Sequence, residues 1–184
     1  IELDEQLFSA YNNRGVLYSR EANYALAVSD FTLLMLLAPD YAPAYHNRAL
    51  VHAAEGNYDL AIADLQQAIA LDPNDGFSFA ERGAVHSRKQ DYDRAIADFD
   101  QAIKLNPAFH EAHYALGLCL KDREQLTEAR AAFEQAVKSS PAFIAAREEL
   151  SEIHRLQDRS RDEIHELEVL AALVTQVGET CNFT

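Results

Sequence analysis

The sequence is poor in the residues that build disulfide frameworks and membrane spans. It has two cysteines, one methionine and no tryptophan in 184 residues. Two cysteines form no disulfide framework, and the helical pattern gives Cys119 an interior position, where we interpret it as a small core residue. No apolar run approaches the roughly 18 residues of a transmembrane helix, since the longest, Leu33 to Ala38, predicts one short helix. No signal peptide is visible, so we expect a cytoplasmic location; export stays open as the alternative, because the sequence begins at Ile1 without a methionine.

Lysine and arginine are scarce as well. They number 16 against 30 aspartates and glutamates, which gives a net charge of −14 at pH 7. Binding to a phosphate backbone needs clustered basic side chains that release counterions, so we expect no nucleic-acid partner. The charge is spread along the chain and is interpreted as a solvated, solubilising surface.

Sequence motifs for catalysis are missing too. There is no glycine-rich phosphate loop, no nucleophile elbow and no Cys-x-x-Cys pair. The seven histidines include the pair His110 and His113, but a metal site needs three or four converging ligands. We therefore expect no enzyme activity, no metal and no cofactor. An accessory subunit of an enzyme or a metal-dependent hydrolase is the alternative that converging histidines would favour.

The sequence does contain a repeat. Four of its five prolines, Pro39, Pro73, Pro107 and Pro141, follow one another at intervals of 34 residues. Segments 8–41, 42–75, 76–109 and 110–143 align without a gap, and 144–177 continues the pattern in degraded form. A constant period of this length is typical of stacked structural repeats, which bind partners along an extended surface.

Each repeat predicts two helices that interlock. Apolar-periodic runs such as 43–55 and 58–71 are separated by turn residues, and Asn23, Asn57 and Asp91 are predicted to cap the second helix. Small residues recur at Gly15, Ala49, Gly83 and Gly117, and large ones at Phe31, Leu65, Phe99 and Phe133. Because large side chains fill the space beside small ones, we expect an all-α fold of about ten closely packed helices.

One spacing resembles the tetratricopeptide repeat (TPR) over residues 8–177. It is carried by Tyr45-x-x-Arg48-Ala49-x-x-His52, Tyr58-x-x-Ala61, Leu65-x-x-Ala68 and Pro73. The resemblance implies a right-handed superhelix (α-solenoid) of stacked antiparallel helix pairs, in a single domain of residues 1–177 with a flexible tail, 178–184. The sequence departs from the family pattern at His113, Arg147 and Glu163. We expect the degenerate fifth unit, 144–177, to cap the array with an amphipathic helix between Ile164 and Val177.

Charged residues vary together between repeats. Arginines occupy equivalent positions on the first helix and aspartates on the second, namely Arg14, Arg48 and Arg82 with Asp30, Asp64 and Asp98. In the fourth repeat both are replaced, by Leu116 and Ala132. This joint replacement predicts a salt bridge within each of the first three repeats.

The resemblance implies a partner-binding groove on the inner face, formed by the first helix of each repeat. The implied lining residues are Asn12, Asn13, Val16, Arg20, His46, Asn47, Leu50, Ala54, Phe77, Ala80, Glu81, Ala84, Arg88, Glu111, Tyr114, Ala115, Leu118 and Asp122. Among them Phe77 and Tyr114 are candidate aromatic anchors, and Asn13 and Asn47 are candidates to hold a peptide backbone. Basic groups that could meet acidic partner groups are Arg20, Arg88, Lys121 and Arg155. We expect a non-enzymatic adaptor or scaffold that binds a peptide or helix of a partner protein; ordinary surface chemistry is the alternative for each residue.

One function of the family is disfavoured. Chaperone-binding members hold a terminal carboxylate with a clamp of lysines, asparagines and an arginine over three repeats. If the clamp starts in the first repeat, only Asn47 conforms, and Glu81 stands at the arginine position, where it would repel a carboxylate.

A second candidate surface lies on the first repeat. Leu33 and Leu36 replace the glutamines, lysines or alanine of the other repeats, so this helix is apolar nearly all round and must be covered. The cover is expected to be the preceding segment with Leu3 and Leu7, a second copy of the chain, or a partner protein. A self-assembling scaffold built through this repeat is therefore the alternative function.

Overall fold

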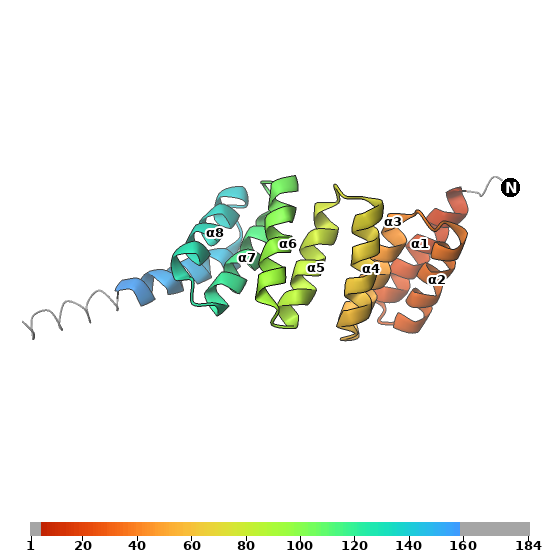
Figure 1. Ribbon diagram of the computed structural model, residues 1–184, viewed down its shortest axis with the longest axis horizontal. Helices are drawn as coiled ribbons and strands as arrows, with labels where there is room; N and C mark the ends of the chain where they lie inside the picture. Colours follow the sequence, from red (N-terminus) through yellow and green to blue (C-terminus); the bar gives the residue numbers. More distant parts are fainter. Residues whose placement is uncertain (1–4, 159–184) are drawn as a thin grey trace, which may run out of the picture.

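The protein is an all-α array of stacked antiparallel helix pairs, as expected from the sequence. The computed structural model describes residues 5–158. Its helices are α1 (Glu5–Arg20), α2 (Tyr24–Leu37), α3 (Ala42–Ala54), α4 (Tyr58–Leu71), α5 (Gly76–Arg88), α6 (Tyr92–Leu105), α7 (His110–Asp122) and α8 (Leu126–Ser139). Residues 144–158 are helical as well. Figure 1 shows these helices following one another along the long axis of the molecule.

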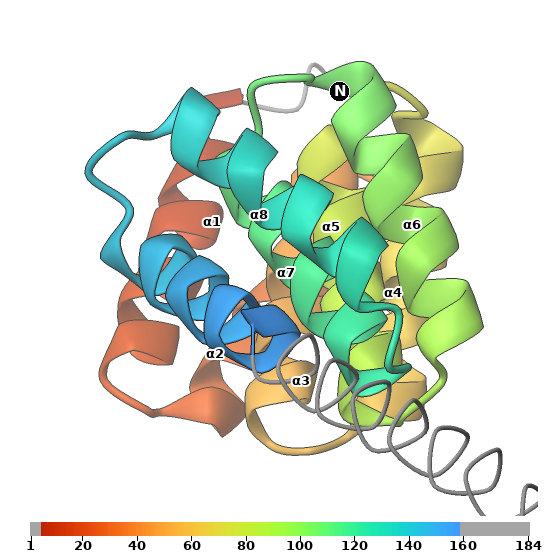
Figure 2. The same cartoon turned by 90° about the vertical axis from the view of Figure 1, so that its left-hand side faces the viewer.

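The odd-numbered helices lie on the inner side of the array. Each helix packs against the next one in the chain, and α1, α3, α5 and α7 also contact one another in that order. Successive even-numbered helices make no comparable contacts in the described part of the chain. Since the odd-numbered helices are closer together, the stack curves around them, and they line the concave face. Figure 2 looks along this stack.

Small residues on the odd-numbered helices allow close contact with aromatic rings on the even-numbered ones. A Cβ atom built on Gly117 would lie 2.5 Å from Phe133 Cε1, and one on Gly15 would lie 2.7 Å from Phe31 Cε1. Both phenylalanines are fully buried. In the second repeat Ala49 is paired with the smaller Leu65 in one buried cluster, so the two sizes compensate. The predicted interlocking of large and small residues is confirmed.

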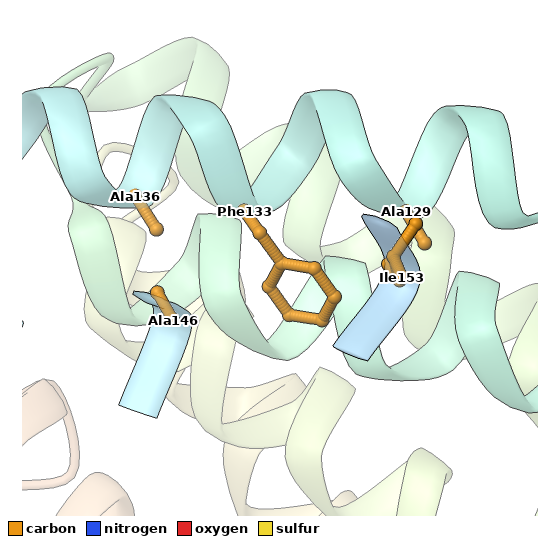
Figure 3. Packing of buried hydrophobic residues seen from close by; sticks show 5 residues of the cluster. All are labelled: Ala129, Phe133, Ala136, Ala146 and Ile153. Atoms are coloured by element: carbon orange, nitrogen blue, oxygen red, sulfur yellow. The ribbon is translucent and has the colours of Figure 1, made fainter. Parts of the chain in front are cut away.

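Residues 144–158 continue the stack beyond α8. Ala146 and Ile153 are fully buried against Phe133, and Figure 3 shows these side chains facing α8. This segment thus contributes the next inner helix in the series. The expected capping helix between Ile164 and Val177, together with Leu3, Glu163, Cys181 and the tail 178–184, lies outside the described residues.

Two of the departures from the repeat pattern, His113 and Arg147, have a common structural role. Tyr45 Oη donates to the carbonyl oxygen of Pro39 at 3.1 Å, and Arg147 Nε donates to that of Pro141 at 2.9 Å. His113 Nε2 lies 3.0 Å from the carbonyl oxygen of Pro107, so it must carry the proton it donates. His113 and Arg147 therefore keep the hydrogen bond that Tyr45 makes to the carbonyl of the proline six residues earlier, whereas the third repeat, with Phe79 at this position, has no donor there.

The helix caps differ in part from the prediction. Asp91 accepts a hydrogen bond from the amide of Arg94 and caps α6 as expected. The prediction for Asn23 and Asn57 was wrong, because neither side chain caps its helix. Their Nδ2 groups instead donate to Glu21 Oε2 at 3.2 Å and to Glu55 Oε2 at 3.3 Å. A cap would require the Oδ1 atom to accept from a backbone N–H, and the side chains are instead oriented so that Nδ2 donates to a neighbouring carboxylate.

The arginine–aspartate pairs predicted from the repeat comparison are confirmed. Arg48 donates from Nε to Asp64 Oδ2 at 2.8 Å and from Nη2 to Asp64 Oδ1 at 2.7 Å. Arg14 with Asp30 and Arg82 with Asp98 have the same bidentate geometry. All three aspartates are buried. Each pair joins the two helices of its repeat, and bidentate geometry makes it specific for arginine.

Candidate concave binding surface

Residues of α5 and α7 surround a hollow on the concave face. Its volume is about 260 Å³. It is lined by Phe77, Ala80, Glu81, Ala84, Phe99, Phe109, Glu111, Ala112 and Ala115. Six of these were candidates from the sequence, so this part of the predicted lining comes together around one depression.

A second hollow of about 340 Å³ lies on the other side of Phe77. Its lining residues are Ala42, Pro43, His46, Asp72, Asp75 and Phe77. Only His46 and Phe77 were candidates here. Asp75 could have been found, because an aspartate just before a helical run is a strong N-cap signal, and its side chain accepts hydrogen bonds from the amides of Phe77 and Ser78. We call the two hollows and the ridge of Phe77 between them the central groove.

Phe77 is the most exposed aromatic anchor of this surface. The residue is 61% exposed although it is large and apolar. One side of its ring packs against Phe109, with ring centroids 4.9 Å apart and an interplanar angle of 60°. The phenylalanine is therefore held in place on one side while the remainder of the ring faces solvent.

Four carboxylates line the central groove, and no lysine or arginine does. Asp72 and Asp75 line one hollow, Glu81 and Glu111 the other. Asp75 is occupied, since its Oδ2 accepts from Ser78 Oγ at 2.5 Å and that hydroxyl also lies 2.8 Å from His46 Nδ1. No hydrogen bond or ion pair joins Glu81 to any other side chain in the described residues. The groove thus combines apolar surface with negative charge.

The lining toward the amino-terminal end is less open than the sequence suggested. Asn47 Nδ2 donates to Asn12 Oδ1 at 2.9 Å, so these two amides hold each other across α1 and α3. Val16 is partly buried against the core around Phe31. Of the remaining candidates, Leu50 is partly buried, and Asn13, Arg20, Ala54 and Arg88 are exposed.

The lining toward the carboxyl-terminal end is largely used in packing. Tyr114 lies between Phe133 and Phe143, at centroid distances of 5.7 and 5.0 Å, and Leu118 packs on the same core. Burial, with Glu149 and Glu148 nearby, raises the pKa of the Tyr114 phenol. Tyr114 is therefore mainly a packing residue, with little free ring surface to act as an anchor.

Lys121, a candidate to meet an acidic partner, already has acidic neighbours. Its Nζ donates to Glu149 Oε2 at 2.7 Å and to Glu152 Oε2 at 2.9 Å. These hydrogen bonds raise the pKa of Lys121. Its charge is neutralised within the protein, whereas Arg155 and Asp122 are exposed.

The apolar outer face of the first repeat is exposed. Leu36 is 75% exposed, and Leu33 and Leu26 on the same helix are exposed too. Leu60 on α4, at the position equivalent to Leu26, is 54% exposed. We call these four residues the outer leucine face; within residues 5–158 nothing covers it.

The histidine pair does not form a metal site in the described part of the chain. His113 is bound to the Pro107 carbonyl, while His110 packs edge-on against Phe143 and lies 3.0 Å from Glu111 Oε2. No group of three or more His, Cys, Asp or Glu side chains could hold a metal ion between residues 5 and 158. None of the helices in this range has the length and apolar content needed to cross a membrane.

Comparisons with known proteins agree with this architecture. Models of the tetratricopeptide repeat match residues 8–41, 42–75, 81–142 and 120–172. The solved structure of MamA 41-end from Desulfovibrio magneticus RS-1 is 22% identical, with a TM-score of 0.74 over 89% of this chain and 93% of that chain. A search of curated protein sequences gives no match.

Two further similar structures concern peptide binding. YrrB, a TPR protein with an unusual peptide-binding site, is 22% identical, with a TM-score of 0.66 over 80% of this chain and 76% of that chain. The first TPR of Spaghetti (RPAP3), bound to the HSP90 peptide SRMEEVD, is 22% identical, with a TM-score of 0.62 over 64% of this chain and 93% of that chain. At these identities the likeness establishes a shared fold.

Proposed function

Because the chain belongs to the tetratricopeptide repeat family, we propose that it is a non-enzymatic adaptor that holds a segment of a partner protein in the central groove. Repeats of this family typically mediate protein–protein interactions, and two proteins of similar structure bind peptides. We further propose that residues 1–177 act as one repeat domain.

The exposed ring of Phe77 is the observation that carries the proposal. A large apolar side chain that is 61% exposed, on the concave face and between two hollows, matches what binding hot spots require. Its backing by Phe109 limits the side-chain entropy that binding would cost.

Replacing Phe77 with alanine is expected to weaken partner binding by about 30-fold, which corresponds to a hot spot of about 2 kcal/mol. The measurement is affinity capture from the source organism with quantitative mass spectrometry, followed by titration of the captured partner. Leu60→Ala is the matched control, because Leu60 is a similarly exposed apolar residue on the outer side of the array. The proposal fails if partners are retained equally by wild type and Phe77→Ala, or are lost equally from both variants.

Self-assembly through the outer leucine face is the second candidate, favoured by the exposure of Leu33 and Leu36. In this case a second copy of the chain would cover the leucines. The variant Leu33→Glu with Leu36→Glu is then expected to sediment as a monomer at concentrations where the wild type sediments as an oligomer. Equal sedimentation of the two proteins would remove this candidate, and circular dichroism would verify that the variant is folded.

A further inference from the structure

We propose that the central groove recognises a segment in which a large apolar residue stands beside a lysine or arginine. The inference rests on the proposed function and specifies the chemistry of the bound segment. It differs from the carboxylate recognition disfavoured by the sequence, since the groove attracts positive charge.

The apolar half of the recognition comes from the hollow between α5 and α7. Its walls carry the small side chains Ala80, Ala84 and Ala115, and Phe99 and Phe109 also line it. The volume of about 260 Å³ leaves room for one large side chain between these walls. The hollow is therefore suited to a single large apolar side chain inserted from an adjacent chain segment.

The charged half comes from Glu81 and Glu111, which line the same hollow. Glu81 has no partner side chain in the part of the chain that the structure describes, and Glu111 pairs only with His110 there. Neither hollow of the central groove is lined by a lysine or arginine. A guanidinium or ammonium group entering here would be attracted by these carboxylates and by the exposed face of Phe77.

Comparison of the repeats shows that the fold does not require these residues. At the position of Glu81 the first, second and fourth repeats have Asn13, Asn47 and Ala115, and only the degenerate fifth unit has a glutamate, Glu149; at that of Phe77 the other units have Ser9, Pro43, Glu111 and Ala145. An equivalent hollow one repeat earlier is lined by Phe8, Ser9, Ala38, Asp40 and Tyr41, without the pair formed by Asp72 and Asp75. Among the aligned units, the combination of a phenylalanine and a glutamate at the positions of Phe77 and Glu81 therefore occurs in the third repeat alone.

A random peptide library displayed on phage tests this specificity with the full chain as bait. We expect selection to enrich peptides with a lysine or arginine beside a leucine, methionine or aromatic residue. Selection on Glu81→Lys with Glu111→Lys is expected to lose this basic preference. A peptide enriched on the wild type should bind that variant at least about tenfold more weakly.

The control is Asp100→Lys with Glu128→Lys, which changes the net charge equally on exposed sites of α6 and α8. It should keep the wild-type preference. Enrichment of peptides without basic residues, or an equal loss with both charge variants, would overturn the inference. If the enriched peptides still lose affinity for Phe77→Ala, groove binding survives without the basic specificity; if they bind Phe77→Ala normally, the proposed function fails as well.

Discussion

Replacing Arg48 with leucine is expected to lower the free energy of unfolding by about 3 kcal/mol. The substitution leaves Asp64 buried without its bidentate partner, and it also removes the 3.0 Å hydrogen bond from Arg48 Nη1 to Thr32. An uncompensated buried carboxylate is far more costly than the net value of the pair. Urea denaturation followed by circular dichroism measures the loss.

The double variant Arg48→Leu with Asp64→Ala should recover most of this stability. It copies the fourth repeat, where Leu116 and Ala132 stand at the two positions. Arg14→Leu is the matched single control and should cost less, because the side chain of Arg14 is 53% exposed and that of Arg48 only 20%. Additive losses in the Arg48 and Asp64 cycle would refute the energetic coupling of the pair.

Replacing Gly117 with alanine is expected to lower the free energy of unfolding by about 2 kcal/mol through overpacking. The new Cβ would lie 2.5 Å from Phe133 Cε1, and the ring has no solvent-exposed side toward which to move. Thermal or urea denaturation of the single variant measures the effect. Gly83→Ala is the milder control, since its Cβ would lie 3.0 Å from Phe99 Cε1.

Phe133→Leu should relieve the clash, because the second repeat combines Ala49 with Leu65 in the same buried arrangement. The loss of unfolding free energy in the double variant Gly117→Ala with Phe133→Leu is therefore expected to be about 1 kcal/mol smaller than the sum of the two single losses. A coupling energy of zero would show that the methyl group added at position 117 does not clash with the ring of Phe133.

The repeat period predicted the fold because it acts through local rules. Helix pairs, their small and large contacts and the three arginine–aspartate bridges all connect residues of one repeat, so comparing repeats within the sequence was sufficient. The caps at Asn23 and Asn57 were not predictable from residue type alone. Both side chains instead orient their Nδ2 groups toward Glu21 and Glu55, and this orientation depends on side-chain rotamers that the sequence does not specify.

The candidate surface was predictable in position but not in composition. The inner helices could be located from the repeat, and Phe77, Glu81 and Ala84 do meet at one hollow. The contacts that bury Tyr114 and neutralise Lys121 could not be predicted. Tyr114 packs against Phe143, just before the helix of 144–158, and Lys121 binds Glu149 and Glu152 on that helix. That unit departs most from the repeat pattern, so repeat comparison alone did not specify how its side chains contact α7 and α8.

Amide hydrogen exchange on the chain, alone and bound to a captured partner, tests the central claim most directly. Binding in the central groove predicts slower exchange in α5 and α7 and unchanged exchange in the outer parts of α2 and α4. Slowing confined to α2 and α4, with α5 and α7 unchanged, would contradict the account and assign partner binding to the outer leucine face.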